Sequence, residues 1–75
     1  MLLTDINKGE KVRITSTHRM DALVQRRLMD LGIMEGTLVM IKRILPLGGP
    51  IAIEAGGQLI GLRRRDAGMI RVESV

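Results

Sequence analysis

The chain of 75 residues carries a formal net charge of +4 at neutral pH and contains neither cysteine nor any aromatic residue. Its length is that of one domain, and the lack of cysteine excludes a disulfide framework and a thiolate metal site. Without Phe, Trp or Tyr, the chain has no ring to stack on unpaired bases or to form an aromatic groove for proline-rich peptides.

The first predicted elements precede residue 16. Apolar side chains within residues 2–6 are expected to plug one end of the core. Residues 10–15 then alternate strictly, with Val12 and Ile14 between charged or polar neighbours. This alternation predicts a half-buried strand.

A helix is predicted next, over Met20–Leu31. Its apolar side chains recur at helical spacing and predict one buried stripe. The stripe comprises Met20, Val24, Leu28 and Leu31. Ser16 or Thr17 is expected to cap the helix, and Asp21 in its first turn suits the positive end of the helix dipole.

Two glycines after this helix predict two turns. Gly32 is expected to end the helix in the left-handed conformation, so that Ile33 folds back onto Leu28. Gly36 marks a second turn, just before the next strand. Structural roles are therefore assigned to four residues: Leu28, Leu31, Gly32 and Gly36.

The second strand is predicted over residues 38–45, and both of its faces are apolar. If Val39 and Ile41 point into the core, Leu38 and Met40 point away from it. Leu38 and Met40 then need either the helix or a partner to cover them.

A rigid loop at residues 46–50 follows, in which Pro46 and Pro50 flank the apolar Leu47 and two glycines. Proline fixes φ at each end, and Gly48 and Gly49 are expected to take positive φ between them. Pro46, Gly48 and Pro50 are assigned structural roles in this loop.

The last third of the chain predicts a hairpin, a helical turn and a final strand. Gly56-Gly57 is a two-residue hairpin signal between a short strand at residues 51–53 and a strand at 58–62. In the second of these strands, Ile60 and Leu62 are expected to face inward, while Gly61 leaves room for close backbone approach. Residues 64–68 predict one helical turn, and residues 69–73 a last strand with inward Ile70 and Val72.

These elements predict a mainly β fold, a small five-stranded barrel over residues 1–75 with one helix inserted between strands one and two. The barrel is expected to be closed or nearly closed, because closure removes strand edges that would otherwise aggregate. The longest stretch without a charge, residues 44–53, has ten residues and contains both prolines. It is too short for a membrane-spanning helix of roughly 20 residues. With no secretory signal at the N-terminus, we expect a soluble, cytoplasmic protein.

Three motifs in this order resemble the FeoA family, the small cytoplasmic proteins of bacterial ferrous iron uptake. They are residues 27–36 (RLMDLGIMEG), residues 46–51 (PLGGPI), and residues 62–64 (LRR) followed by Ala67, Ile70 and Val72. The resemblance spans nearly the whole chain. It implies an SH3-like barrel and a partner, FeoB, which is a membrane transporter with a cytoplasmic GTP-binding domain.

The chain departs from this family at Gly49, because the proline loop of the family usually reads Pro-Leu-Gly-Asp-Pro. Any hydrogen bond or charge that this Asp supplies to the loop or to a partner is missing here. We therefore expect a more mobile loop. The C-terminal domain of the iron-dependent repressors shares the same barrel. There it is joined to a helix-turn-helix domain that this chain lacks, so we interpret it as a relative in fold only.

Catalytic, cofactor and metal sites are not predicted. His18, near Asp21 at the helix entrance, is interpreted as a surface or capping residue. The glycine pairs lack the downstream Gly-Lys-Ser/Thr of a phosphate loop, so GTP chemistry must belong to the partner. Ferrous iron prefers imidazole and carboxylate ligands, and the eight acidic residues are scattered among twelve basic ones. The methionines are interpreted mainly as core filler.

The basic pairs and triplet allow two interpretations: a solvated surface, or a docking face for an acidic or phosphate-bearing partner. The corresponding alternatives for Leu38 and Met40 are packing beneath the helix, or the apolar centre of that contact. The predicted partner-binding residues are Leu38, Met40, Lys42, Arg43, Leu47, Arg63, Arg64 and Arg65.

The leading functional hypothesis is a non-enzymatic adaptor that binds the cytoplasmic part of FeoB and biases its GTP-driven cycle. No small-molecule substrate is expected. A nucleic-acid-binding or iron-regulatory barrel is the alternative, and its binding should weaken steeply as salt rises. A weakly self-associating module, with the second strand as its seam, is a third possibility.

Overall fold

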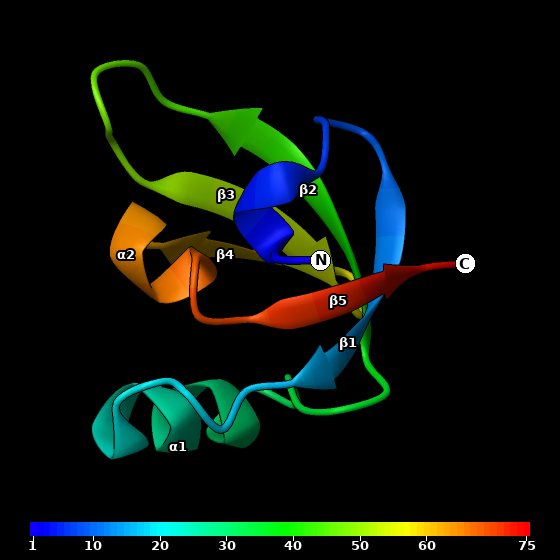
Figure 1. Cartoon of the computed structure of the whole chain (residues 1–75), viewed down its shortest axis with the longest axis vertical. Helices are drawn as coiled ribbons and strands as arrows, with labels where there is room; N and C mark the ends of the chain where they lie inside the picture. The colour runs from blue at the N-terminus through cyan, green and yellow to red at the C-terminus, as the bar shows by residue number, and fades with distance from the viewer.

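A computed structural model describes residues 1–75, and its main element is a curled antiparallel sheet of five strands (Figure 1). The order across the sheet is β4-β3-β2-β1-β5. The strands are β1 (Lys11–Ser16), β2 (Leu38–Ile44), β3 (Ile51–Ala55), β4 (Gln58–Leu62) and β5 (Arg71–Ser74). The predicted mainly β fold of five short strands is therefore confirmed.

Alternation along the strands builds the core on the concave side of the sheet. Val12 and Ile14 of β1 are buried, as are Val39 and Ile41 of β2. Leu3, in the short 3-10 helix η1 at the N-terminus, is also fully buried, which confirms the predicted plug. The core is thus aliphatic throughout, as a chain without aromatic residues requires.

Two shifts of register help to curl the sheet. The pairing of β2 with β3 shifts between Ile41 and Arg43, and that of β1 with β5 shifts between Ile14 and Ser16. An extra residue in one strand of an antiparallel pair increases the local twist. The curl brings β4 and β5 round to opposite sides of the core, where they do not pair with each other.

The inserted helix α1 (Ala22–Asp30) lies between β1 and β2, as predicted, but is shorter than the predicted range Met20–Leu31. Asp21 is its N-cap, because the Oδ1 atom accepts a hydrogen bond of 2.8 Å from the N–H of Leu23. Met20 is buried, but it precedes the helix. The helix therefore begins two residues later than the apolar spacing suggested.

The prediction that Ser16 or Thr17 caps α1 is wrong, because residues 17–20 form a separate turn. In that turn the N–H of Met20 donates to the carbonyl of Thr17 at 3.1 Å. The buried Thr17 hydroxyl instead accepts from Nε2 of Gln25 at 3.1 Å. The Ser16 hydroxyl is hydrogen-bonded to the ring of His18.

The buried stripe of α1 is narrower than predicted. Leu28 is the only fully buried residue of the helix, and Val24 is half-buried. Leu31 is 38% exposed, so its assignment to the buried stripe is wrong. It lies past the last helical residue, where the chain turns away from the helix axis.

The predicted glycine turns after α1 are confirmed. Gly32 has φ +82°, and its N–H donates to the carbonyl of Met29 at 2.9 Å. The N–H of Ile33 donates to the carbonyl of Leu28 at 2.9 Å, which completes a Schellman ending. Gly36, at φ +91°, donates to the carbonyl of Ile14 at 2.7 Å and so attaches the turn to β1.

The loop at residues 46–50 turns on a different pair of residues than predicted. Leu47 and Gly48 take positive φ, at +61° and +73°, whereas Gly49 does not. The N–H of Gly49 donates to the carbonyl of Pro46 at 3.2 Å and closes a two-residue turn. A Cβ on Gly49 would lie 3.0 Å from the Leu45 Cβ, so a larger residue here would crowd Leu45.

The remaining elements follow the predicted order. The hairpin of β3 and β4 turns at Gly56-Gly57, and α2 (Arg64–Ala67) supplies the helical turn before β5. Gly61 does not serve a close backbone approach, because a Cβ placed there would meet nothing within 4 Å. Neither α1 nor α2 has the length and apolar character needed to cross a membrane.

Candidate functional site

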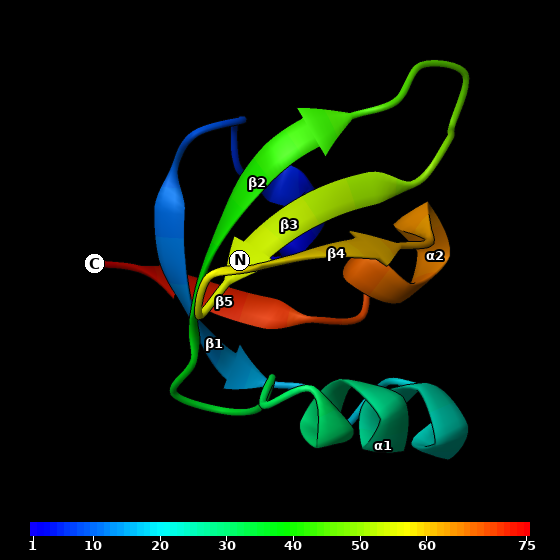
Figure 2. The same ribbon diagram turned by 180° about the vertical axis from the view of Figure 1, so that it is seen from behind.

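The outer face of the sheet carries part of the predicted docking surface. Seen from behind, β2, β3 and β4 lie side by side and form this face (Figure 2). Met40 of β2 is paired with Glu54 of β3, which is paired with Leu59 of β4, so these three residues form one row. We call the surface formed by Met40, Lys42, Arg43, Ala52, Glu54 and Leu59 the outer face.

A shallow groove of about 470 Å³ runs over the outer face, and Lys42, Arg43, Glu54 and Leu59 are among its lining residues. The Lys42 Nζ lies 3.6 Å from Oε2 of Glu54. Both side chains are about half exposed, so this ion pair contributes little to stability. The groove therefore combines exposed cationic side chains with an exposed leucine.

Leu38 lies on the same side of β2 as Met40, two residues earlier, at the start of the strand. It pairs with Arg13 of β1, which in turn pairs with Glu73 of β5 through an ion pair of 3.2 Å. Leu38 is 43% exposed and Met40 is half-buried. The prediction that both point away from the core is confirmed, and both remain accessible.

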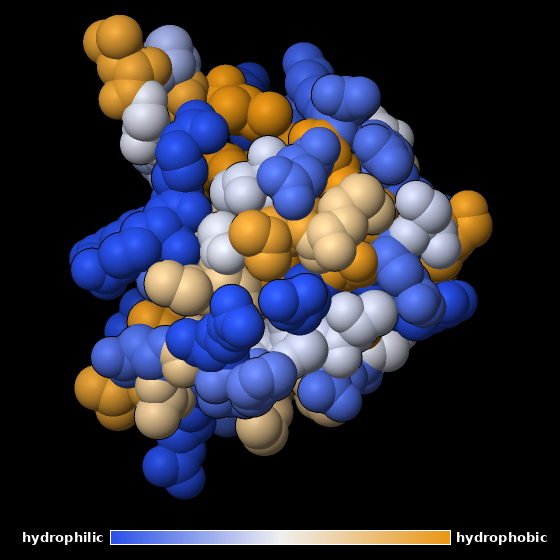
Figure 3. All heavy atoms as spheres, viewed as in Figure 1, coloured by the Kyte–Doolittle hydropathy of each residue, from blue (hydrophilic) through white to orange (hydrophobic).

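Leu47 is separate from the outer face, at the tip of the loop between β2 and β3. Its side chain is fully exposed. In the space-filling view this loop projects as a hydrophobic tip above the hydrophilic side chains that surround α2 (Figure 3). The tip is an exposed apolar point on a hydrogen-bonded two-residue turn.

The arginine triplet is divided between two places. Arg64 donates from Nη2 to the carbonyl of Leu45 at 3.4 Å, at the base of the loop that carries Leu47. Arg63 and Arg65 line a cleft between β4 and α1. The predicted residues therefore fall into three groups: the β2 surface, the loop tip with its Arg64 support, and this cleft.

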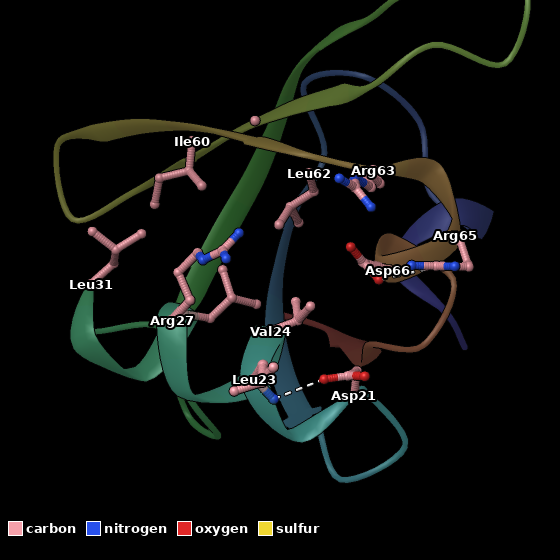
Figure 4. A pocket seen from close by; sticks show the side chains of 12 residues that line it. Asp21, Leu23, Val24, Arg27, Leu31, Ile60, Leu62, Arg63, Arg65 and Asp66 are labelled. Carbon is pink, nitrogen blue, oxygen red and sulfur yellow. Dashed lines mark hydrogen bonds and ion pairs between the residues drawn. The ribbon is translucent and has the colours of Figure 1, made fainter.

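The cleft, which we call the edge cleft, was missed by the sequence interpretation (Figure 4). It has a volume of about 410 Å³ and is bounded by α1 on one side and by β4 and the start of α2 on the other. Leu28 and Leu62 form its buried floor, and Val24 and Ile60 are half-buried above them. One sequence feature could have pointed to the cleft: Leu23 is an apolar residue that lies beside the predicted buried stripe. In the structure its side chain is 75% exposed.

Charged groups are unevenly distributed around the edge cleft. Asp66 is buried, and its Oδ1 lies 3.8 Å from Nε of Arg65. Asp21 is occupied as the cap of α1. Arg27 and Arg63 have no acidic group within 4.0 Å, so two cations in this cleft are without an internal partner.

Titratable side chains do not gather elsewhere in the fold. No three His, Asp or Glu residues lie close enough together to hold a metal ion. His18, the one histidine, is exposed and is hydrogen-bonded to Ser16. The outer face, the loop tip and the edge cleft are therefore the candidate functional features of this chain.

Comparison with known proteins gives consistent matches over the whole chain. The family model of the FeoA domain matches residues 1–74. The FeoA protein from Chlorobium tepidum is 36% identical, with a TM-score of 0.94 over all of this chain and 70% of that chain. FeoA from Stenotrophomonas maltophilia, complexed with zinc and described as an SH3 domain protein, is 25% identical, with a TM-score of 0.82 over 97% and 89%.

A manganese-dependent transcriptional repressor matches all of this chain with 41% of its own, at a TM-score of 0.88 and 17% identity. At that identity the similarity concerns the fold alone. The predicted SH3-like architecture is confirmed by these comparisons.

Proposed function

Because the chain belongs to the FeoA family, which is linked to ferrous iron transport, we propose that it is a non-enzymatic accessory protein of a FeoB-type transporter. It binds the cytoplasmic part of the transporter and is itself cytoplasmic. Family membership over residues 1–74 is the observation that carries this proposal. The related S. maltophilia protein has been described as a candidate activating factor of bacterial ferrous iron transport.

The proposed mechanism is a shift of the transporter between its nucleotide-dependent states. A ligand changes such an equilibrium only by the difference between its affinities for the two states. The chain's glycine pairs lack the Gly-Lys-Ser/Thr that follows in a phosphate loop, so the GTP-binding and hydrolytic groups belong to the transporter. The accessory protein contributes contact free energy to one state of its partner.

The outer face together with Leu38 and Leu47 is the proposed contact surface. Leu38, Met40 and Leu47 supply the apolar part, which gains free energy when it is removed from water. Lys42 and Arg43 provide cationic groups that favour an acidic partner and increase the association rate. Arg64 acts indirectly, by holding the base of the loop that presents Leu47.

A pull-down with the cytoplasmic portion of the transporter tests this surface. We expect retention of the wild-type protein and loss of the Leu38→Asp/Met40→Asp variant, because buried unpaired carboxylates are unfavourable in an apolar contact. Met29→Asp is the matched control, since Met29 is an exposed methionine on α1 and lies outside the proposed surface.

Equal retention of the wild-type protein and the double variant would show that Leu38 and Met40 are not part of the contact surface. If the wild-type protein is not retained under any nucleotide condition, the proposal that a FeoB-type transporter is the partner is wrong. Circular dichroism of each variant establishes that a loss of retention is not a loss of folding.

A further inference from the structure

The two edges of the sheet are treated differently by the rest of the chain. The outer edge of β5 is covered by the N-terminal residues: Leu3 donates to the carbonyl of Ile70 at 2.9 Å, and Val72 donates to that of Met1 at 2.8 Å. Leu2 and Arg71 form an isolated bridge between them. β4, at the opposite end of the strand order, is paired only with β3. The sheet therefore has one open edge.

The open edge presents unpaired backbone groups. The two-residue turn at Gly56-Gly57 makes Ala55 and Gln58 a hydrogen-bonded pair, so hydrogen-bonded pairs alternate along the hairpin from there. Leu59 and Gly61 consequently direct their N–H and C=O groups away from β3. No turn, loop or cap hydrogen bond elsewhere in the chain uses these groups.

Edge strands are normally protected by charge, by proline or by a covering segment. β4 has none of these within Gln58–Leu62. Gly61 adds no side chain, and the space beside it is open. A second peptide backbone can therefore approach β4 closely at this position.

The open edge faces α1 across the edge cleft (Figure 4). Nε2 of Gln58 donates to the carbonyl of Leu31 at 2.9 Å and closes the cleft at one end. Val24 and Ile60 offer half-buried apolar surface between the two walls. An incoming strand would thus find backbone partners along one side and aliphatic contacts beneath it.

The charges of the edge cleft determine which side chains an incoming strand should carry. Arg27 and Arg63 line the cleft without acidic partners, whereas Arg65 already has Asp66. Carboxylates on an incoming segment would supply the missing partners, and arginine can bind a carboxylate through two parallel hydrogen bonds. A basic segment would be repelled.

We propose that the open edge of β4 accepts an extended acidic and aliphatic peptide segment as a sixth strand of the sheet. Backbone hydrogen bonds to Leu59 and Gly61 supply affinity, and side chains at alternate positions supply specificity. Aliphatic side chains contact Val24 and Ile60, and carboxylates pair with Arg27 and Arg63. The proposal goes beyond the accessory function above, because it does not depend on which protein supplies the segment.

The test is an NMR titration of the full chain with a blocked synthetic peptide of alternating valine and glutamate. We expect the amides of Leu59 and Gly61 to shift and to exchange more slowly with solvent when the peptide is bound. A peptide N-methylated at alternate residues, prepared in both registers, lacks the required donors on one edge. The form whose methyl groups face β4 should bind about tenfold more weakly or worse, and the form whose methyl groups face away should bind as the unmodified peptide does.

A charge exchange tests the proposed selectivity. Arg27→Glu should bind the valine–glutamate peptide about tenfold more weakly and should prefer a valine–lysine peptide instead. Arg26→Glu makes the same charge change on the same helix, at an exposed residue that does not line the edge cleft, and should leave both affinities unchanged.

Several results would overturn the proposal: no binding of the peptide, equal binding of both N-methylated forms, or shifts confined to the outer face. Because only this chain and synthetic peptides are used, failure here is independent of the transporter pull-down.

Discussion

At the scale of single residues, Leu47 combines an unfavourable backbone conformation with a fully exposed apolar side chain. Positive φ brings the Cβ of an ordinary residue close to the following carbonyl oxygen, at a cost of roughly 1–2 kcal/mol. Leu47 has φ +61°, and because its side chain is fully exposed, no burial of apolar surface offsets this cost. The proposed docking role explains both properties, since the two-residue turn presents the leucine at the tip of the loop.

We predict that Leu47→Asn raises the free energy of unfolding by about 0.5–1 kcal/mol, because asparagine tolerates the left-handed conformation. Urea denaturation measures the change, and Leu59→Asn, at an exposed leucine in β4, is the control without positive φ. The same Leu47 variant should be retained less by the transporter. A stability equal to or below that of wild type would contradict the strain at Leu47.

Gly32 provides a second prediction at this scale. Gly32→Ala should lower the free energy of unfolding by about 1 kcal/mol, because φ +82° disfavours a Cβ although the surrounding space is open. Gly61→Ala is the matched control: space is equally open there, φ is not positive, and we expect a change within about 0.5 kcal/mol. Equal effects at both positions would contradict the role of φ.

The turns show what the sequence predicts at residue scale. Gly32 and Gly36 were predictable because each follows the end of an apolar pattern, where a left-handed residue is needed. The turn at Leu47 was not, because Pro46-Leu47-Gly48-Gly49-Pro50 offers two glycines for positive φ. Which residues turn depends on the strand register and on the space beside Gly49, where a Cβ would meet Leu45.

At the scale of elements, α1 is attached to the rest of the fold chiefly at its ends. Asp21 caps its start, and the Schellman bonds to Leu28 and Met29 close its end. A helix of nine residues is marginal without tertiary packing. Because Leu28 is its only fully buried residue, we infer that α1 depends strongly on that contact.

Leu28→Ala is therefore predicted to lower the free energy of unfolding by about 2–4 kcal/mol. Leu23→Ala removes the same atoms from an exposed position on the same helix, and its effect should stay below about 0.5 kcal/mol. Thermal or urea denaturation of both variants measures the difference. Similar losses for the two would contradict the packing described for α1.

Amide hydrogen exchange gives a second prediction for this element. The amides of α1 should exchange faster than those of the central strands β1, β2 and β3, because local opening of α1 removes one buried side chain. Saturation with the valine–glutamate peptide should slow exchange in α1, since the bound strand adds contacts to its open side. Equal protection of α1 and β2 in the free protein would contradict this account.

The helix also shows where sequence reasoning was insufficient at element scale. Its existence and position followed from the apolar spacing, but its start depended on the separate turn over residues 17–20. Leu31 has the spacing of a buried residue and lies at the rim of the edge cleft instead. Spacing predicts which side chains share a face, and not how far the neighbouring element stands from that face.

At the scale of the whole molecule, the apolar patterns of the strands and of the helix, together with the turn signals between them, were sufficient to predict the sheet, its helix insertion and its aliphatic core. The edge cleft could not be predicted, because α1 and β4 are separated by two strands in the sequence. Its arginines also come from distant positions: Arg27 and Arg63 appear in the sequence as members of two unrelated basic clusters. Only the curl of the sheet brings them to one cleft.

The central claim is that this chain alters a transporter by binding one of its nucleotide states more tightly than the other. Calorimetric titration into the cytoplasmic GTP-binding part of a FeoB transporter, loaded with GDP or with a non-hydrolysable GTP analogue, measures both affinities. The account predicts dissociation constants that differ by about fivefold or more. Identical constants in the two states, or no heat of binding in either, would contradict it.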